Sequence, residues 1–198
     1  MVQIQPWDRD GVIGTIDAGV GMDNHLYYQF RPDSYISGNR KGHKETEYYA
    51  YGSVSGKLKR YLDWGADLKA HPTGYRSGDM NIGGHVSISA FVKGEPVTLT
   101  GKFYHDRRSP DYWMSEFFSN HYVWSNSFDK ENETRIEATL HFPSWGLELG
   151  AGQSVINNKV YYDRNRSPVQ HDDAVSVTGV YARKDFRFGG LHLNHRVL

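Results

Sequence analysis

Few residue groupings in this chain could carry out chemistry. The carboxylate pairs Asp172/Asp173 and Glu131/Glu133 are of the type that glycosidases use as acid and base. Both pairs fall in predicted loops or turns, where solvated charge is common. The sequence contains no Gly-x-Ser-x-Gly nucleophile elbow, phosphate-binding loop or dinucleotide fingerprint. It therefore predicts no catalytic residue, and we expect the protein not to be an enzyme.

The ten histidines also lack the spacing of a metal site. They are scattered along the chain, and no His-Glu-x-x-His pattern occurs. His192 and His195 are three residues apart, so in a strand they point to opposite faces and cannot bind one ion together. We therefore predict no metal ligand and no cofactor.

Composition excludes one further class of function. The 198 residues include 23 basic and 23 acidic side chains, so no overall field attracts nucleic acid. Cysteine is absent, which removes disulfides and thiolate chemistry. The length suits residues 1–198 as a single domain, or as a fragment of a larger one. Frequent aromatic residues and glycine favour strands and turns over helices.

Apolar and polar side chains alternate with a period of two residues along much of the chain, which indicates that β-strands position the candidate residues. In 134–142 the apolar Ile136, Ala138 and Leu140 alternate with polar neighbours, and 61–71 behaves in the same way. We expect an all-β protein, an antiparallel up-and-down meander, with about the first 23 residues irregular. The predicted strands are 24–31, 47–58, 61–71, 81–92, 96–105, 119–128, 133–142, 146–155, 158–163, 173–184 and 189–198.

Loop lengths and strand lengths favour a segment of a transmembrane β-barrel. Short and long connections mostly alternate along the chain, as in outer-membrane barrels, with the short link 143–145 as an exception. Many strands approach the length that crosses a bilayer. Aromatic residues, Tyr49 and Tyr51 among them, gather near the strand ends, where they would form girdles at the two membrane interfaces. The start lacks a secretory signal and the end alternates up to Leu198, so we expect a fragment of a longer precursor.

The polar faces of these strands are the best candidates for function. If they line an aqueous lumen, their mixed charges would pass small hydrophilic solutes with little ion preference. The pore-lining candidates are Asp67, Lys69, Lys102, Arg135, Glu137, His141 and Glu148. Arg107 and Arg108, in the predicted loop 106–118, are candidates for constricting the mouth or binding an anion.

Several stretches resemble the putative porin family of the Bacteroidota outer membrane. The clearest begins Phe-Tyr-His-Asp-Arg-Arg-Ser-Pro at Phe103, and the likeness is strongest over residues 100–198. The matching stretches are Phe103–Phe128, Thr134–Leu140, Val160–Asp163, Pro168–Gln170 and Arg183–Leu198. The resemblance implies an outer-membrane β-barrel of porin type in contact with lipid, exported with a signal peptide and longer than this chain.

Two other classes of protein remain open at this point. A soluble β-sandwich or closed β-barrel could bind carbohydrate, with Tyr112, Trp113 and Trp145 as stacking platforms. An outer-membrane enzyme with its site on the loops is the third possibility. The sequence does not indicate the solute or the oligomeric state.

Overall fold

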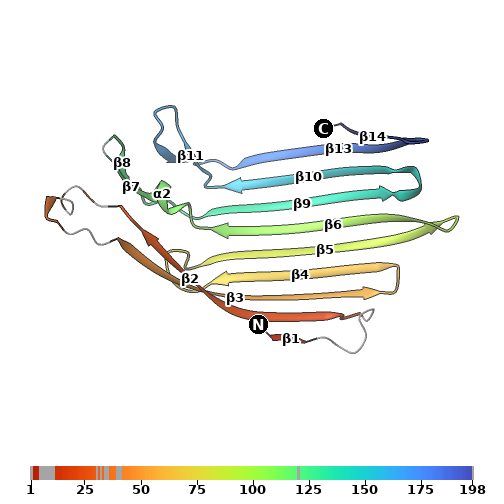
Figure 1. Cartoon of the computed structure of the whole chain (residues 1–198), viewed down its shortest axis with the longest axis horizontal. Helices are drawn as coiled ribbons and strands as arrows, with labels where there is room; N and C mark the ends of the chain where they lie inside the picture. Colours follow the sequence, from red (N-terminus) through yellow and green to blue (C-terminus); the bar gives the residue numbers. More distant parts are fainter. Residues whose placement is uncertain are drawn as a thin grey trace.

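The computed structural model describes residues 2–4, 12–29, 31, 33, 36–38, 42–119 and 121–197. Ten strands form one antiparallel sheet in the order β1-β2-β3-β4-β5-β6-β9-β10-β13-β14 (Figure 1). They are β1 (Val2–Ile4), β2 (Thr15–Tyr27), β3 (His43–Leu58), β4 (Leu62–His71), β5 (Asp79–Val92), β6 (Glu95–Arg108), β9 (Glu131–Phe142), β10 (Leu147–Asn157), β13 (Val175–Phe188) and β14 (Leu191–Val197). This order confirms the predicted all-β up-and-down meander.

The remaining elements are short and lie between the long strands. Two small hairpins, β7–β8 and β11–β12, stand outside the main sheet. The short elements are α2 (Tyr112–Ser115), β7 (Glu116–Phe118), β8 (Val123–Ser125), η1 (Pro143–Trp145), β11 (Val160–Tyr162) and β12 (Pro168–Gln170). No helix in the described part of the chain is both long enough and apolar enough to cross a membrane.

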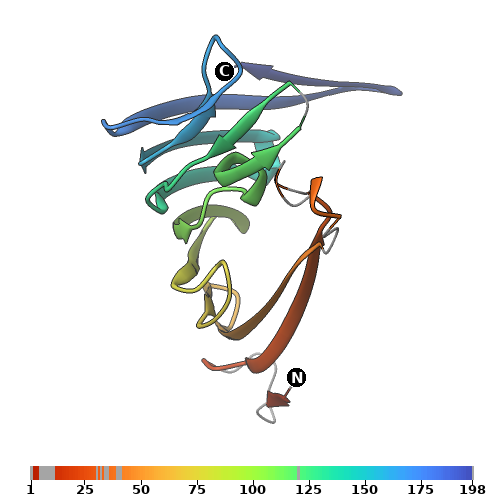
Figure 2. The same ribbon diagram turned by 90° about the vertical axis from the view of Figure 1, so that its left-hand side faces the viewer.

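The sheet curves into an open arc (Figure 2). Within the described residues, β1 pairs only with β2 and β14 only with β13, so the two edges do not meet. An arc of antiparallel strands with free edges is a segment of a β-barrel wall, as the sequence predicted.

The two faces of the arc differ in polarity and in exposure. In β2 the side chains of Ile16, Val20 and Met22 are exposed, whereas Asp17 and Asp23 are half-buried. Side chains converge on the concave side of a curved sheet and diverge on the convex side. The half-buried polar residues of β2 therefore mark the concave face, and the register with β3 continues this division into the next strand.

The convex face is apolar along the turn-proximal part of the strands and polar beyond it. The apolar part includes Leu99 and Phe103 of β6 and Ile136 of β9. Nearer the long loops, the outward pair His105 and Thr134 is joined by a 2.9 Å hydrogen bond. The change from apolar to polar defines an apolar band with an edge on the loop side.

The convex face has no second layer of protein over it among the described elements. Val20 is 82% exposed, Val180 67% and Ile136 60%. A β-sandwich requires a second sheet against such a face. The single-layer arc therefore does not support the soluble sandwich that was an alternative at the sequence level.

Several strand boundaries expected from the sequence are wrong. Residues 15–23 belong to β2, although they were expected to be irregular; residues 1 and 5–11 lie outside the described residues. Gly19 and Gly21 interrupt the polar side of the alternation there, and this obscured the strand in the sequence. The expected strands 119–128 and 158–163 contain, among their described residues, only the three-residue β8 and β11, which lie outside the main sheet within long connections.

The two strands wrongly placed in the main sheet explain the apparent exception in the loop pattern. Residues 109–130 form one long connection between β6 and β9, which are neighbours in the sheet. Residues 158–174 likewise form one long connection between β10 and β13. With both expected strands removed from the sheet, the 143–146 link falls at the short-turn end, and long loops and short turns occupy opposite ends of the sheet (Figure 1).

Candidate functional site

All seven pore-lining candidates lie on the concave face. The register places Lys102 opposite Glu137 and His141 opposite Glu148, while Asp67 and Lys69 share the same face of β4. Because side chains alternate along a strand, residues an even number apart stay on one face, so the prediction of a common face follows from spacing and register.

Four of these residues line one hollow of the concave face. Asp67, Lys102, Arg135 and Glu137 surround a depression of about 300 Å³ together with Tyr104. Two glycines, Gly83 and Gly84, also line it. A second hollow of about 700 Å³ adjoins it along β9, β10 and β13, and Arg135 and Glu137 line both.

Charges of opposite sign alternate over this surface. The Arg135 guanidinium lies 2.6 Å from a Glu133 oxygen and 3.9 Å from a Glu137 oxygen. Its guanidinium carbon is also 5.8 Å from the centre of the Tyr104 ring. The Lys69 ammonium lies 4.1 Å from the centre of the Tyr49 ring. Three acids and three bases among the candidates leave the surface without a dominant sign.

Tyrosines fill the space above glycines on the same face. A Cβ atom at Gly21 would lie 2.2 Å from Tyr49, and one at Gly19 would lie 2.5 Å from Tyr51. Tyr181 covers Gly150 in the same way and donates a 2.8 Å hydrogen bond to Glu148. The sequence had counted Tyr49 and Tyr51 among the aromatic residues at the membrane interfaces. Their place on the concave face corrects that interpretation.

The connection 109–130 crosses the loop end of the concave face (Figure 2). It leaves β6 and reaches β2, from which β6 is separated by β3, β4 and β5. The Tyr112 ring of α2 stacks on Tyr27 of β2 with 3.9 Å between ring centres. The Gln29 side chain donates to the Glu116 carbonyl and accepts from the Phe118 N–H. These contacts hold the connection over the concave side.

An ion pair between Arg31, which follows β2, and Glu116 attaches the same connection. The Arg31 guanidinium donates to a Glu116 carboxylate oxygen at 2.7 Å, and the Tyr112 hydroxyl donates to the other oxygen at 2.8 Å. The hydrogen bond from Arg31 holds the pKa of Glu116 below its ordinary value. Burial, reinforced by the hydrogen bond to Glu116, raises the pKa of Tyr112 to about 12. Glu116 is therefore the anionic centre of this attachment.

The two arginines predicted in the loop lie instead in strand β6. Because they are consecutive, they point to opposite faces: Arg107 is exposed on the convex side, and Arg108 lies on the concave side. Arg108 is bound to Glu131 at 2.9 Å and to Asp106 at 3.2 Å. The expectation that both residues stand together in a mouth loop is therefore wrong.

The three aromatic residues proposed as a sugar platform are not together either. Tyr112 is 8% exposed and packed against Tyr27, and Trp113 lies beside it in α2. Trp145, 63% exposed, belongs to η1 in the short link between β9 and β10. No single ligand could stack on all three.

Sequence reasoning missed the residues that attach the 109–130 connection. Gln29 and Glu116 are 87 positions apart, and neither lies in a recognisable motif. The aromatic content of 112–124 is a signal that could have indicated a packed segment there. Its rings form a continuous series of contacts from Tyr27 to Trp124.

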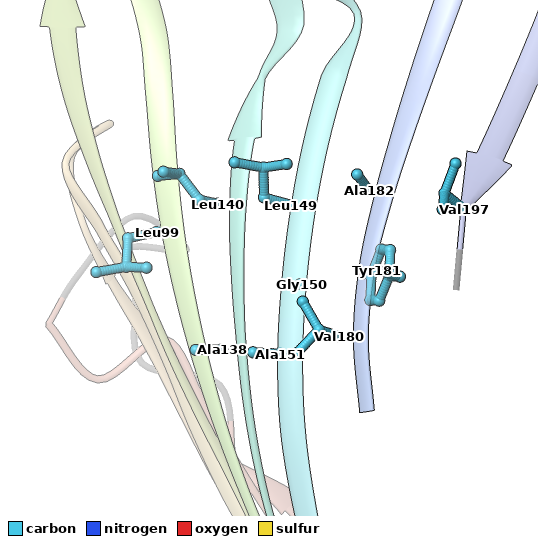
Figure 3. Close-up of a pocket in the computed structure, with 10 residues that line it drawn as sticks. All are labelled: Leu99, Ala138, Leu140, Leu149, Gly150, Ala151, Val180, Tyr181, Ala182 and Val197. Atoms are coloured by element: carbon cyan, nitrogen blue, oxygen red, sulfur yellow. The ribbon is translucent and has the colours of Figure 1, made fainter. Parts of the chain in front are cut away.

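The convex face is hollowed near β14. Figure 3 shows a shallow groove that runs across β6, β9, β10, β13 and β14. Its lining is mainly aliphatic, and includes Leu99, Leu140, Leu149 and Val180. An exposed apolar surface of this extent is suited to lipid chains.

A curved antiparallel sheet that is apolar outside and polar inside, with long loops at one end, defines a segment of a transmembrane β-barrel. The chain belongs to the family described as "Putative porin", which it matches over residues 9–198. Membership of this family indicates a porin-like role in an outer membrane. A search of curated proteins found no match, and neither did a search of solved structures.

Proposed function

We propose that the complete protein passes small hydrophilic solutes by passive diffusion along the concave face. The observation that supports this is the gathering of all seven polar candidates on one face, while the opposite face carries an apolar band that no described element covers. Water and polar solutes are the natural neighbours of the first face, and outer-membrane lipid of the second.

The balance of charge supports weak ion selectivity. Lys102 faces Glu137 directly across the β6–β9 pair, and Arg135 lies between Glu133 and Glu137. Rings of one sign select ions, whereas alternating signs create no strong barrier to either. The 109–130 connection narrows the loop end of this route, which limits the size of the solutes that pass.

Conductance across a planar bilayer tests this proposal. The complete folded protein should give discrete steps, with a reversal potential near zero in a salt gradient. Lys102→Glu should shift the reversal potential toward cation preference, because it converts the pair with Glu137 into two acids. Lys44→Glu makes the same charge change opposite Leu26 on the convex face and should leave the potential unchanged.

Two results would contradict the proposal. One is the absence of conductance from protein shown to be folded and inserted. The other is an equal shift of the reversal potential by the Lys44 and Lys102 variants, because charge on the outer face should not affect solutes inside.

A further inference from the structure

Three strands bring two carboxylates and an imidazole together at the loop end of the concave face. Asp23 of β2 lies directly opposite Glu47 of β3, and His71 is the last residue of β4. One ligand atom from each side chain lies within 4.8 Å of the other two. The three positions are 24 residues apart in sequence, so no short-spacing motif could reveal the group.

Two members of this group are buried without the hydrogen bonds that burial requires. Glu47 is 1% exposed and His71 is 8% exposed. The Glu47 Oε2 and His71 Nε2 atoms are shielded from solvent and make no hydrogen bond among the described residues. Burying a carboxylate oxygen or a ring nitrogen without a hydrogen-bond partner costs free energy.

The 72–78 turn closes over this group and explains its burial. The turn is fastened at His71, whose carbonyl accepts from the Gly78 N–H at 2.7 Å. It passes so close that a Cβ atom at Gly74 would lie 2.6 Å from the Glu47 Cγ atom. Thr73 also accepts a hydrogen bond from the Tyr48 N–H. The turn therefore forms a lid of backbone above Glu47.

Two basic side chains lie near Glu47 without donating a hydrogen bond to its buried oxygen. The Arg76 Nε atom is 3.6 Å from Glu47 Oε2, and the His25 Nε2 atom is 3.7 Å from it. Both distances exceed those of hydrogen bonds. The Arg76 side chain is 45% exposed and can move into solvent. His25 Nε2 is itself buried without a hydrogen bond and is available as a fourth ligand.

From this geometry we propose that Asp23, Glu47 and His71 bind a divalent transition-metal cation of the zinc type. One imidazole and two carboxylates are a donor set that Zn²⁺ accepts, with a further position open to water or His25. Ligand atoms around a tetrahedral ion lie about 3.4 Å apart, so closing the site requires side-chain shifts of about 1 Å. The ion would join β2, β3 and β4 beneath the 72–78 turn.

Metal titration of the complete protein, folded in detergent and stripped with a chelator, tests the proposal. Calorimetry with ZnCl₂ should show one saturable site, and Co²⁺ in its place should give visible absorption bands of a low-coordinate complex. Glu47→Gln and Asp23→Asn should each weaken binding by at least about tenfold, as should His71→Gln. Asp23 is half-buried, so its variant keeps the test valid if a Glu47 variant fails to fold.

Glu45→Gln is the matched control. Glu45 lies on the same face two residues from Glu47 and pairs with His43 at 3.2 Å, outside the group of three. Its variant should bind Zn²⁺ like the wild type. Absence of saturable binding by the folded wild type would overturn the proposal. So would equal weakening by Glu45→Gln, or Ca²⁺ binding as tight as Zn²⁺ and insensitive to His71→Gln.

Discussion

Tyr49 and Gly21 show how individual residues shape the concave face. The ring of Tyr49 lies over Gly21 on the neighbouring strand, in space that any larger residue would occupy. Glycine weakens a strand because it has no side chain to pack, and a cross-strand aromatic ring restores that packing. The pair also leaves Tyr49 positioned against Lys69 and His71.

Replacing Gly21 by alanine should therefore destabilise the protein. The new Cβ atom would meet Tyr49 at 2.2 Å, so the ring must move away from its neighbours. We expect a loss of about 1–3 kcal/mol in the free energy of unfolding, measured by urea titration in detergent.

Gly101→Ala is the control for this change. A Cβ atom at Gly101, on the convex face, would have no neighbour within 4 Å. We expect it to be neutral or slightly stabilising, because alanine is less flexible in the unfolded chain. Equal destabilisation by both substitutions would show that the contact with Tyr49 is not the cause.

The position of the 109–130 connection depends on the charge of Glu116. Its attachment to β2 centres on Glu116, which accepts hydrogen bonds from Arg31 and Tyr112. The pKa of Glu116 is lower in the folded protein than in the unfolded chain. A lowered carboxyl pKa stabilises the attached state above the ordinary pKa, and this contribution is lost as the pH falls through the lowered value.

Acidification should therefore release the connection from β2. Tryptophan fluorescence, to which Trp113 and Trp124 of the connection contribute, should be followed from neutral pH to about pH 3 and should report a transition below the ordinary carboxyl pKa. Glu116→Gln should remove this transition and leave the connection more weakly attached at neutral pH. A transition of the same size in the Glu116→Gln variant would assign the pH dependence to another group.

The β7–β8 hairpin, outside the main sheet, shows why an element can be placed wrongly from sequence. Residues 119–128 are rich in aromatic residues and were expected to form a strand of the sheet. They belong instead to a connection in which Phe117 stacks on Trp124 with 4.8 Å between ring centres. Aromatic residues favour strands and packed loops alike, so the pattern did not separate the two.

At the scale of the whole molecule, the sheet has a convex face with an apolar band and a polar concave face. Ile136 lies within the apolar band of the convex face, opposite Phe103 of β6. Thr139 lies three residues further along β9, on the concave face opposite Thr100. The two residues lie close together along β9, but their side chains point to opposite faces of the sheet.

Substituting arginine at each position tests the orientation of the wall. Ile136→Arg should cost about 2–4 kcal/mol in the free energy of folding into lipid vesicles, because the charge faces hydrocarbon. Thr139→Arg should cost much less, because its side chain reaches the polar side. Equal costs at the two positions, or a larger cost at Thr139, would contradict the assignment of the faces.

The alternation of residue types was enough to predict the meander and the common face of Asp67, Lys69, Lys102, Arg135, Glu137, His141 and Glu148. Both follow from the two-residue period of a strand, which is a local property of the chain. The same period was obscured in β2, where Gly19 and Gly21 replace polar side chains.

Contacts between distant residues depended on the curvature and order of the strands. Arg31 and Glu116 are 85 positions apart and meet because the arc brings the loop ends of β2 and β6 within reach of one connection. Asp23, Glu47 and His71 meet because three neighbouring strands share one face and a turn folds over them. Such proximity is set by the register between strands, which local alternation does not encode.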